Sequence, residues 1–398
     1  MKPISSRMST ISLSPIKDIE RTARKLTNVI SLAQGIPAFP PPTQITQTVI
    51  QHLSQHQAHT YTVPEGRLSL RKKIAQDILK RSQTHYNPET EILITGGAMA
   101  AIQATLLTLL NPGDEVVVLT PAYASYFGQI RSAGGVPICV SMRPENQFRL
   151  CLEDLKQAIR PKTKAILFAN PNNPTGVNLQ KQELQQILEL ALQHNLYVIA
   201  DEVYRDFVWQ GQHTPAASFP ELKPQLISVF GFSKTYAITG YRVGYLATSA
   251  SLANQILKVH DNMMTCAPHP AQIAAEAALE LNEKEKYFMH PTLLQNRTKI
   301  HQTLNQLPHF QCHLPHAGYY LFAKLLPPSQ HQPGSSTQFS QFLLQHAQVA
   351  TVPGNAFGQE GYLRLSFALP PQQLETALKR IQKLLQSQSL PPTHTQAA

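Results

Sequence analysis

The chain has few cysteines and no long apolar run. Four cysteines, Cys139, Cys151, Cys266 and Cys312, occur in 398 residues, and none belongs to a CxxC pair. This spacing excludes the common zinc and dithiol motifs, so we interpret the four as packing residues. No window reaches the ~18 uninterrupted apolar residues of a membrane span, and the N-terminal segment lacks the apolar block of a signal peptide. We therefore expect a cytoplasmic protein with no membrane partner.

Acidic residues are also scarce. Asp and Glu number 24 against 34 Lys and Arg, which gives a formal net charge of +10. A positive chain raises the possibility of nucleic-acid binding, but the basic residues are scattered and accompany no recognition motif. We expect no nucleic-acid partner and a basic surface that favours anionic ligands.

Short apolar runs rich in β-branched residues are the main structural signal. They predict strands at 91–95, 115–120, 165–169, 196–200, 226–230 and 243–248. Runs that are apolar on both faces are typical of a parallel sheet covered by helices. Helical patterns at 99–110 and 182–194 separate the strands, so the sequence predicts an α/β domain. After Pro291 the composition changes, and a last strand-like run at 362–369 indicates a second, smaller unit.

Unusual residues follow the predicted strands. Ligands of a parallel α/β sheet gather beyond the carboxyl ends of its strands. These ends carry a helix start suited to anions, an aromatic ring, an amide, a carboxylate, a phenol and an amine, from Gly96-Gly97-Ala98, Tyr123, Asn173, Asp201, Tyr204 and Lys234. An aldehyde cofactor with a phosphate group and a basic ring nitrogen would use all of them.

Each of these residues has a chemical and an ordinary interpretation. Lys234 can form an imine with an aldehyde, or it can be a surface lysine. Asp201 can pair with a protonated ring nitrogen and keep the ring an electron sink, or it can cap a helix. The backbone N–H groups of Gly96 and Gly97, with the guanidinium of Arg242, can bind a phosphate, or they can form a tight turn and a surface ion pair.

Three further residues are open in the same way. Tyr123 can stack on a cofactor ring or pack in the core. Asn173 and Tyr204 can both donate to or accept from a ring hydroxyl, or they can satisfy nearby backbone groups.

Several motifs in one order resemble a known family. They are NPNNPTG at 170–176, ADEVY at 200–204, FSKTYAITGYRVGY at 232–245, SLAQGIPAFPPP at 31–42, YTVPEGRLSLR at 61–71, NPGDEV at 111–116 and LRLSFA at 363–368. Across residues 13–369 the chain resembles the class I/II aminotransferases of the fold-type I pyridoxal-phosphate family.

The resemblance implies a fold and its division. We expect α/β architecture, with a large domain over 46–285 that has a mainly parallel, helix-covered sheet. A smaller α+β domain built from both chain termini is expected over 1–45 and 286–390. Residues 391–398 are expected to form a mobile tail.

The resemblance also implies catalytic roles. Lys234 matches the lysine that holds pyridoxal 5'-phosphate as a Schiff base and moves the proton between Cα and the cofactor carbon. Asp201 matches the partner of the ring nitrogen, and Asn173 and Tyr204 match the ligands of the ring hydroxyl. Tyr123 matches the aromatic residue that stacks on the ring.

Other matching residues are expected to bind phosphate. The backbone of Gly97 and Ala98, the side chain of Ser233 and the guanidinium of Arg242 match this group. Tyr61 matches a tyrosine that reaches the phosphate from a neighbouring subunit, which implies a homodimer with shared active sites.

The chain departs from the family's pattern at two positions. It has Ala98 where some members have a hydroxyl or amine side chain, and Gly231 where some have serine. The phosphate is therefore expected to depend more on backbone groups, Ser233 and Arg242.

The substrate contacts follow from the same resemblance. Arg364 matches the arginine that binds the α-carboxylate, with Gly35 beside it, and Tyr123 and Asn173 are further expected contacts. The segments 11–16 and 316–322, with Tyr319 either lining the site or simply packing, are candidates for the side-chain pocket.

We predict a ping-pong aminotransferase that moves the α-amino group of an L-amino acid to a 2-oxo acid. A lyase or cyclase reaction on the same scaffold would keep every residue named so far, because these residues operate the cofactor without choosing the reaction. A non-catalytic sensor would be expected to carry a DNA-reading helical domain before the matched region. Aspartate, aromatic amino acids, methionine or glutamine, and guanidino or cyclic amino acids all remain possible donors.

Overall fold

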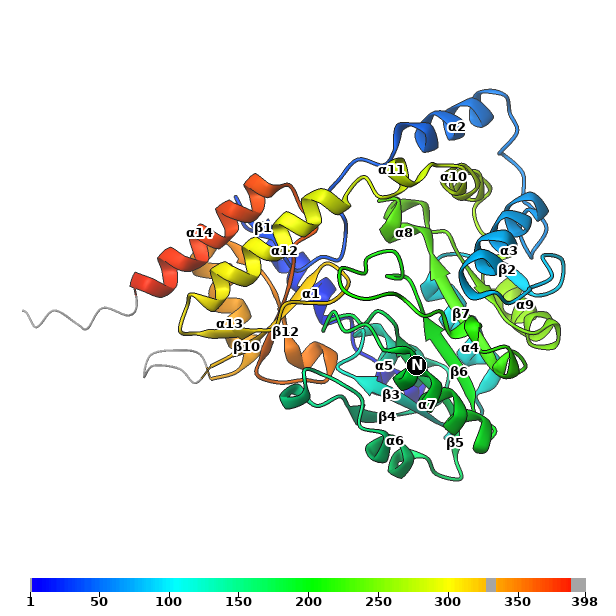
Figure 1. Ribbon diagram of the computed structural model, residues 1–398, viewed down its shortest axis with the longest axis horizontal. Helices are drawn as coiled ribbons and strands as arrows, with labels where there is room; N and C mark the ends of the chain where they lie inside the picture. The colour runs from blue at the N-terminus through cyan, green and yellow to red at the C-terminus, as the bar shows by residue number, and fades with distance from the viewer. Residues whose placement is uncertain (1, 327–333, 388–398) are drawn as a thin grey trace, which may run out of the picture. The chain divides into compact units, whose positions relative to one another are not determined.

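The computed structural model describes residues 2–326 and 334–387, and these form two compact units (Figure 1). Unit 1 contains the described residues of 1–12, 36–290 and 316–318. Unit 2 contains those of 13–35, 291–315 and 319–398. The predicted tail, 391–398, lies outside the described residues. Each helix in the described parts of the chain is too short or too polar to span a bilayer.

A mainly parallel sheet forms the centre of unit 1. Within the described residues its strands run in the order β2-β8-β7-β6-β5-β3-β4. Their bounds are β2 (Ile92–Thr95), β3 (Glu115–Thr120), β4 (Val136–Ser141), β5 (Thr163–Ala169), β6 (Tyr197–Asp201), β7 (Leu226–Gly231) and β8 (Gly244–Ala247). Every residue of β2 is buried, as are most of β3, β5, β6 and β7, which confirms the helix-covered sheet expected from the apolar runs.

Two strands have features that the apolar runs did not specify. β8 pairs antiparallel with both β7 and β2, so its first residue lies at the edge where the parallel strands end. β4 is an edge strand that the apolar pattern did not predict. Its side chains are mostly exposed or half-buried and it contains Pro137, so it lacks the continuous apolar signal of a central strand.

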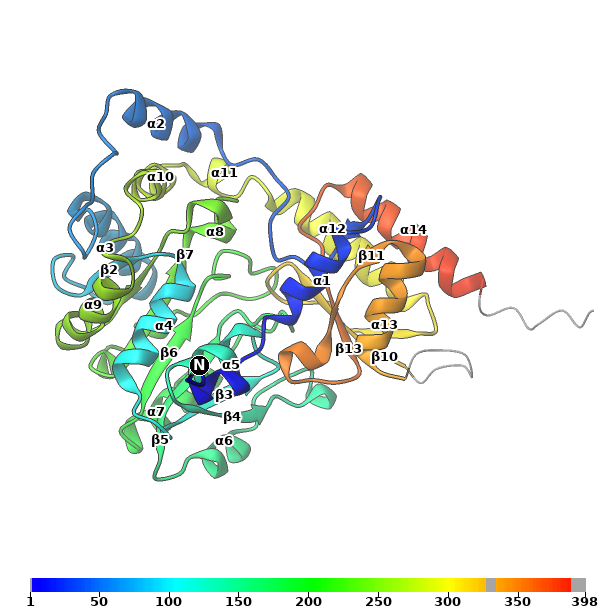
Figure 2. The ribbon, with the colours of Figure 1, turned by 180° about the vertical axis from the view of Figure 1, so that it is seen from behind.

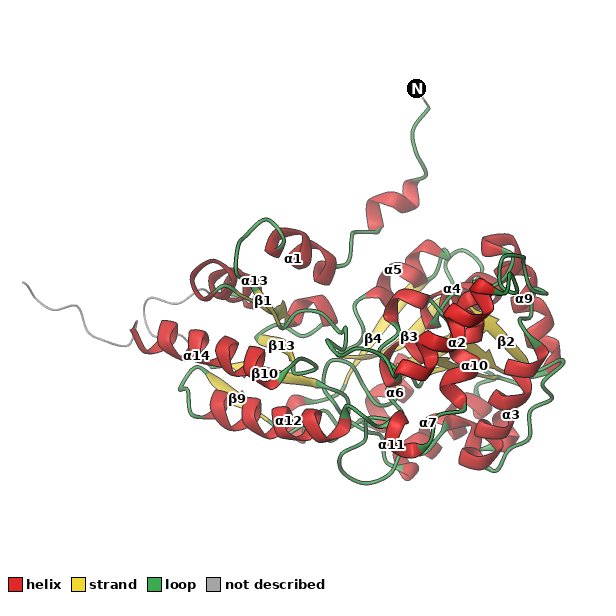
Figure 3. Ribbon diagram, turned by 90° about the horizontal axis from the view of Figure 1, so that it is seen from above, coloured by secondary structure: helices red, strands yellow, loops and turns green. Residues whose placement is uncertain are grey.

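Helices cover both faces of this sheet, and Figure 3 shows α4, α5 and α9 on one side and α7 on the other. The helices of unit 1 are α2 (Thr43–Ser54), α3 (Leu68–Ser82), α4 (Ala98–Leu109), α5 (Ser125–Ser132), α6 (Leu152–Ala158), α7 (Lys181–Gln193), α8 (Phe232–Thr235), α9 (Ala250–Met264), α10 (His269–Leu279) and α11 (Glu283–Lys286). Apolar residues of α4, α5 and α9 pack against the sheet in one buried cluster.

Unit 2 has antiparallel strands surrounded by helices (Figure 2). Its main sheet has the order β12-β13-β10-β9, and β1 pairs in parallel with β11. The elements are α1 (Pro15–Ala23), β1 (Ile30–Ser31), α12 (His290–Asn305), β9 (Phe310–Cys312), β10 (Tyr320–Leu325), α13 (Ser336–Phe342), β11 (Val349–Ala350), β12 (Val352–Pro353), β13 (Tyr362–Ser366) and α14 (Pro371–Ser387).

The unit boundaries lie at other residues than the predicted 46 and 285. Residues 36–45 and 286–290 belong to unit 1. The helix α2 that follows residue 42 packs against α10, which keeps its leading segment with unit 1. The first described residues also belong there, since the guanidinium of Arg7 donates to the carbonyl oxygen of Ser132 at the end of α5.

The centre of the sheet generates a stability prediction. Ile199 lies between Leu167 and Ile227 in the strand register, and all three are fully buried. Ile199→Ala should lower the free energy of unfolding by about 2–5 kcal/mol, through lost burial and the cavity left behind. Urea unfolding of the purified chain measures this change. Leu79→Ala, on a side chain that is 41% exposed, is the matched control, and an equal loss in both variants would contradict the prediction.

Candidate active site

The sheet register gathers the candidate residues of unit 1 at one edge. Ala169, at the end of β5, pairs with Asp201, at the end of β6, and Asp201 pairs with Val229 of β7. The antiparallel strand β8 places Gly244 opposite both Gly231 and Thr95. The loops that follow β2, β5, β6 and β7 therefore start from the same edge of the sheet, where they carry the predicted cofactor ligands.

Asp201 is a buried carboxylate at this edge. Its Oδ2 accepts a hydrogen bond of 2.6 Å from the hydroxyl of Tyr126, and its Oδ1 accepts one of 3.2 Å from the backbone N–H of Val203. Burial raises the pKa of Asp201 to about 6, although both hydrogen bonds and the charge of Lys234 oppose the rise. The carboxylate would be more stable with a further cation beside it.

Tyr126 was not among the predicted site residues. It lies on α5, is fully buried, and its ring meets that of Tyr123 edge to face at 5.6 Å between centroids. The hydrogen bond to Asp201 is the contact that gives it a place in the site. Nothing in its local sequence distinguishes it from a core tyrosine, because the contact joins two segments far apart in the chain.

The turn before α4 forms a cradle suited to an anion. Gly97 is the N-cap of α4 with φ +85°, no side chain caps the helix, and its first turn has no acidic residue. A Cβ on Gly97 would lie 2.7 Å from Nη2 of Arg242, so the guanidinium lies directly against this backbone. Helix N–H groups and a guanidinium together favour a phosphate.

Gly244 allows β8 to approach this cradle. A Cβ there would lie 2.8 Å from the backbone nitrogen of Ala98, 2.9 Å from the carbonyl carbon of Gly97 and 2.6 Å from the carbonyl oxygen of Phe230. All three are backbone atoms and cannot move aside easily. The two departures from the family's pattern also meet here, since a Cβ on Gly231 would lie 3.8 Å from the Cβ of Ala98.

Lys234 and Ser233 lie on α8, the single helical turn that follows β7. Both are half-buried, and the charge of Lys234 acts on Asp201. Asn173 and Tyr204 are buried residues of the loops after β5 and β6. The structure thus brings the predicted amine and carboxylate together and places the predicted amide and phenol in loops of the same sheet edge.

Arg364 and Gly35 belong to unit 2. Arg364 lies on β13 and is only 1% exposed. Its guanidinium donates to the carbonyl oxygen of Ala33, and its Cζ lies 4.3 Å from the ring centroid of Tyr320 and 4.9 Å from that of Phe357. Two aromatic rings and a carbonyl therefore hold this cation in place.

Two tyrosines lie against Gly35. The hydroxyl of Tyr319 donates to its carbonyl oxygen at 3.0 Å. The hydroxyl of Tyr320 would lie 1.9 Å from a Cβ at this position, so a larger residue would require the tyrosine to shift. A role of Tyr319 in lining the substrate pocket stays a prediction.

The structure also gives the positions of Tyr61 and of the two predicted pocket segments, but these positions do not test the predicted roles. Tyr61 is 81% exposed on unit 1. The two segments expected to line the pocket, 11–16 and 316–322, each divide between the two units.

The residues of unit 1 fit pyridoxal phosphate. Gly97 and Arg242 form a cradle for a phosphate, and Asp201 has a carboxylate that burial leaves in need of a cation. Lys234 provides an amine beside that carboxylate. A phosphate group, a protonated ring nitrogen and an aldehyde are the complements of these three features.

Comparison with known proteins agrees with this interpretation. The model of the family described as aminotransferase class I and II matches residues 27–381. The aspartate aminotransferase of Thermotoga maritima is 34% identical over 388 residues, which cover 96% of this chain and all of that protein. The aromatic-amino-acid aminotransferase 2 of Thermococcus litoralis is 33% identical over 394 residues, covering 97% of this chain and 99% of that protein.

A solved structure has the same fold. The crystal structure of aspartate aminotransferase from Thermotoga maritima superposes with a TM-score of 0.89 at 33% identity, covering 96% of this chain and all of that one. The predicted family, fold class, activity and cofactor are confirmed, while the roles of individual residues stay predictions. The chain therefore belongs to the class I and II aminotransferase family and is a pyridoxal-phosphate-dependent aminotransferase.

Proposed function

We propose that Lys234, Asp201 and Arg364 are the principal residues with which this enzyme moves the α-amino group of an L-amino acid to a 2-oxo acid. The observation that supports this most is the environment of Asp201. Its carboxylate is buried beside Lys234, and its pKa is raised to about 6. A carboxylate in this state favours a ligand that brings a positive charge to it.

Each residue has a distinct task in the proposed ping-pong reaction. Bound pyridoxal phosphate supplies an aldehyde for covalent attachment and a protonated ring that withdraws electrons from Cα of the amino acid. Asp201 stabilises the charge of the ring nitrogen. With the cofactor bound, the ε-amine of Lys234 would take the proton from Cα of the substrate and hold it for return. Tyr204 and Asn173 bind the ring hydroxyl, and Tyr123 stacks on the ring.

The phosphate is bound by the turn before α4. Backbone N–H groups of Gly97 and Ala98, the hydroxyl of Ser233 and the guanidinium of Arg242 are the proposed ligands. The helix start and the guanidinium both favour negative charge, so they would hold the phosphate group at this turn.

Arg364 binds the α-carboxylate of the substrate. Its guanidinium can form two parallel hydrogen bonds with a carboxylate, which fixes the direction of the Cα–H bond to be broken. Gly35 is the proposed neighbour of the bound carboxylate. Because Arg364 is held by two aromatic rings and the carbonyl of Ala33, little of its freedom remains to be lost on binding.

The proposal extends to the oligomeric state of the enzyme and to its amino donors. We propose a cytoplasmic homodimer in which Tyr61, exposed in the single chain, reaches the phosphate of the neighbouring subunit. The relatives are named for aspartate and for aromatic amino acids, and both classes are donors to test first. None of these names supports the lyase or cyclase alternative.

Lys234→Ala should abolish the covalent link between cofactor and chain, because it removes the ε-amine that is proposed to form the link. We expect the variant to lack the absorbance of the Schiff base between cofactor and chain, and to lack the borohydride-reducible adduct on the peptide that contains residue 234. Turnover should fall by about 10³-fold or more. Lys258→Ala, an exposed lysine of α9, is the control and should behave as wild type. Retention of the adduct in the Lys234 variant would show that another residue is the anchor.

Asp201→Asn should remove a pH dependence from the cofactor-free chain. The pKa of Asp201 is about 6 in the folded chain against an ordinary 3.8, so this group adds stability below about pH 4 that is lost as the pH rises through 6. Relative to the variant, the wild-type free energy of unfolding should fall by roughly 2–3 kcal/mol between pH 4 and 7. Urea unfolding at several pH values measures this difference. A difference that stays constant with pH would contradict the prediction.

Arg364→Leu should mainly weaken substrate binding. Loss of the charged fork should lower kcat/KM by about 10²-fold, mostly through KM, while the absorbance of the bound cofactor is kept. Arg364→Lys keeps the charge without the fork and should recover only part of the loss. Arg380→Leu, which removes another guanidinium of unit 2, should leave KM unchanged. An unaltered KM in Arg364→Leu would exclude the assigned role.

A further inference from the structure

The helix α8 has little internal support of its own. It consists of four residues, Phe232 to Thr235, and the hydrogen bond from the N–H of Tyr236 to the carbonyl of Phe232 is 3.3 Å long. A single turn costs more conformational entropy than one hydrogen bond returns, so its position depends on tertiary contacts. Its first residue continues from β7, and Phe232 stacks on Tyr236 with 5.9 Å between ring centroids.

The last residue of α8 is fastened by a buried carboxylate. Thr235 follows Lys234 directly and is buried, and its hydroxyl donates a hydrogen bond of 3.0 Å to Oδ2 of Asp206. Asp206 lies in the segment after β6, in the turn that also carries Tyr204, since the N–H of Phe207 donates to the carbonyl of Tyr204. One short turn therefore carries both the proposed phenol ligand and the partner of Thr235.

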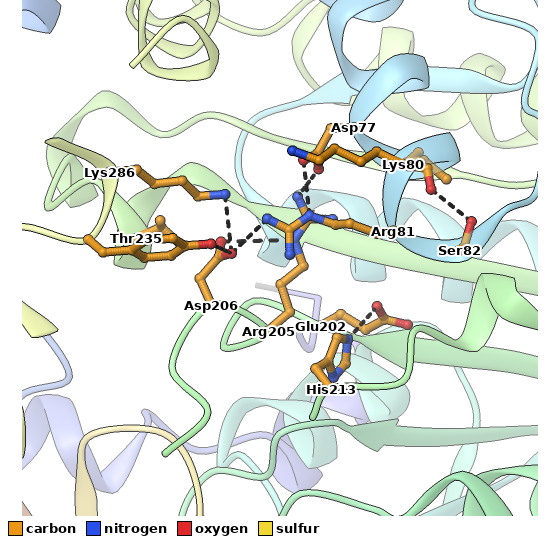
Figure 4. Close-up of polar contacts among 12 residues, drawn as sticks. Asp77, Lys80, Arg81, Ser82, Glu202, Arg205, Asp206, His213, Thr235 and Lys286 are labelled. Atoms are coloured by element: carbon orange, nitrogen blue, oxygen red, sulfur yellow. Dashed lines mark hydrogen bonds and ion pairs between the residues drawn. The ribbon is translucent and has the colours of Figure 1, made fainter. Parts of the chain in front are cut away.

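Asp206 is itself fixed by cations from two other segments and by its neighbour in the chain, Arg205 (Figure 4). Its Oδ1 lies 2.9 Å from Nη2 of Arg81 on α3 and 3.2 Å from Nζ of Lys286 on α11. Nε of Arg205 lies 4.0 Å from Oδ2, and Arg205 and Arg81 are both paired with Asp77. The cluster holds three cations against two carboxylates, and the side chain of Asp206 is only 4% exposed.

These cations determine the protonation of Asp206. Burial alone would raise its pKa, but Arg81, Lys286 and Arg205 outweigh burial and hold the pKa below its ordinary value. An ionised carboxylate only accepts hydrogen bonds, so the Thr235 hydroxyl must donate. Threonine has few χ1 rotamers, and a hydroxyl committed to a fixed acceptor leaves the backbone of this residue little freedom.

We propose that Asp206 is a positioning residue of the active site, which acts through the Thr235 hydroxyl to hold α8 and thereby aim the ε-amine of Lys234. This inference rests on the proposed role of Lys234. The ion-paired cluster fixes Asp206, the hydrogen bond transmits that fixed position to Thr235, and the peptide bond transmits it to Lys234. Neither Asp206 nor Thr235 contacts the substrate in this account.

Thr235→Val is the sharpest test, because valine has the same shape and removes the donor without touching any ion pair of the cluster. A displaced Lys234 should react more slowly with pyridoxal phosphate, so the rate at which the cofactor-free chain forms the covalent link should fall about 10-fold. The link forms when the amine condenses with the aldehyde and one water leaves. We also expect kcat to fall by about 10- to 10²-fold with KM nearly unchanged.

Two control variants separate positioning from simple destabilisation. Thr235→Ser restores the donor and should return both the link-formation rate and kcat to within about threefold of wild type. Thr248→Val removes another buried hydroxyl, one that donates to the carbonyl of Leu226 at 2.6 Å, and should lower only the midpoint of thermal unfolding. All rates are measured well below that midpoint.

Three outcomes would overturn the inference: a wild-type rate of link formation in Thr235→Val, a Thr235→Ser variant as impaired as Thr235→Val, or a Thr248→Val variant with the same kinetic loss. The Lys234→Ala result distinguishes these from failure of the proposed function. If Lys234→Ala lacks the link but Thr235→Val behaves as wild type, only the positioning role of Asp206 is wrong. If Lys234→Ala keeps the link, the proposed anchor itself is wrong.

Discussion

The burial of two carboxylates, Asp201 and Asp206, constrains the whole functional edge of unit 1. Removing an ionised carboxylate from water is costly unless cations or hydrogen-bond donors surround it. The two carboxylates lie close together in the chain, but different groups surround them. Asp206 receives Arg81, Lys286 and a hydroxyl, and its pKa is held below the ordinary value. Asp201 has a hydroxyl and a backbone N–H as its hydrogen-bond donors, and its pKa rises to about 6. Asp206 stabilises the fold, and Asp201 favours a cationic ligand.

Sheet topology places the segments that carry the two carboxylates at one edge of the sheet. Parallel strands end at the same edge, so the loops after β2, β5, β6 and β7 start from neighbouring points. The antiparallel strand β8 begins at that edge, which allows Arg242 to lie against Gly97. Gly244 makes this approach possible because any side chain there would collide with backbone atoms. An anion cradle and a cation site are thus built from segments distant in the chain.

Unit 2 contains a buried cation that is likewise surrounded by compensating groups. The guanidinium of Arg364 is buried, and the rings of Tyr320 and Phe357 with the carbonyl of Ala33 replace its lost hydration. The hydroxyl of Tyr320 also fills the space that a Cβ at residue 35 would need. In both units the residues that would touch cofactor or substrate are held by neighbours that would touch neither, as preorganised sites require.

The apolar runs were enough to predict the central strands, and the ordered motifs were enough to identify the family, while the individual cofactor ligands stay predictions. A strand that is buried on both faces has a continuous apolar run, which can be recognised in the sequence. Reactive side chains that directly follow such a run can be recognised from the same short stretch of sequence. The direction of β8, the edge strand β4, the contact of Tyr126 with Asp201 and the ion pairs around Asp206 could not be predicted in this way. Each depends on which distant segments become neighbours, and strand pairing or charge pairing leaves no periodic signal in either partner alone. The local pattern therefore specified which groups are present, and the folded chain alone specified which of them meet.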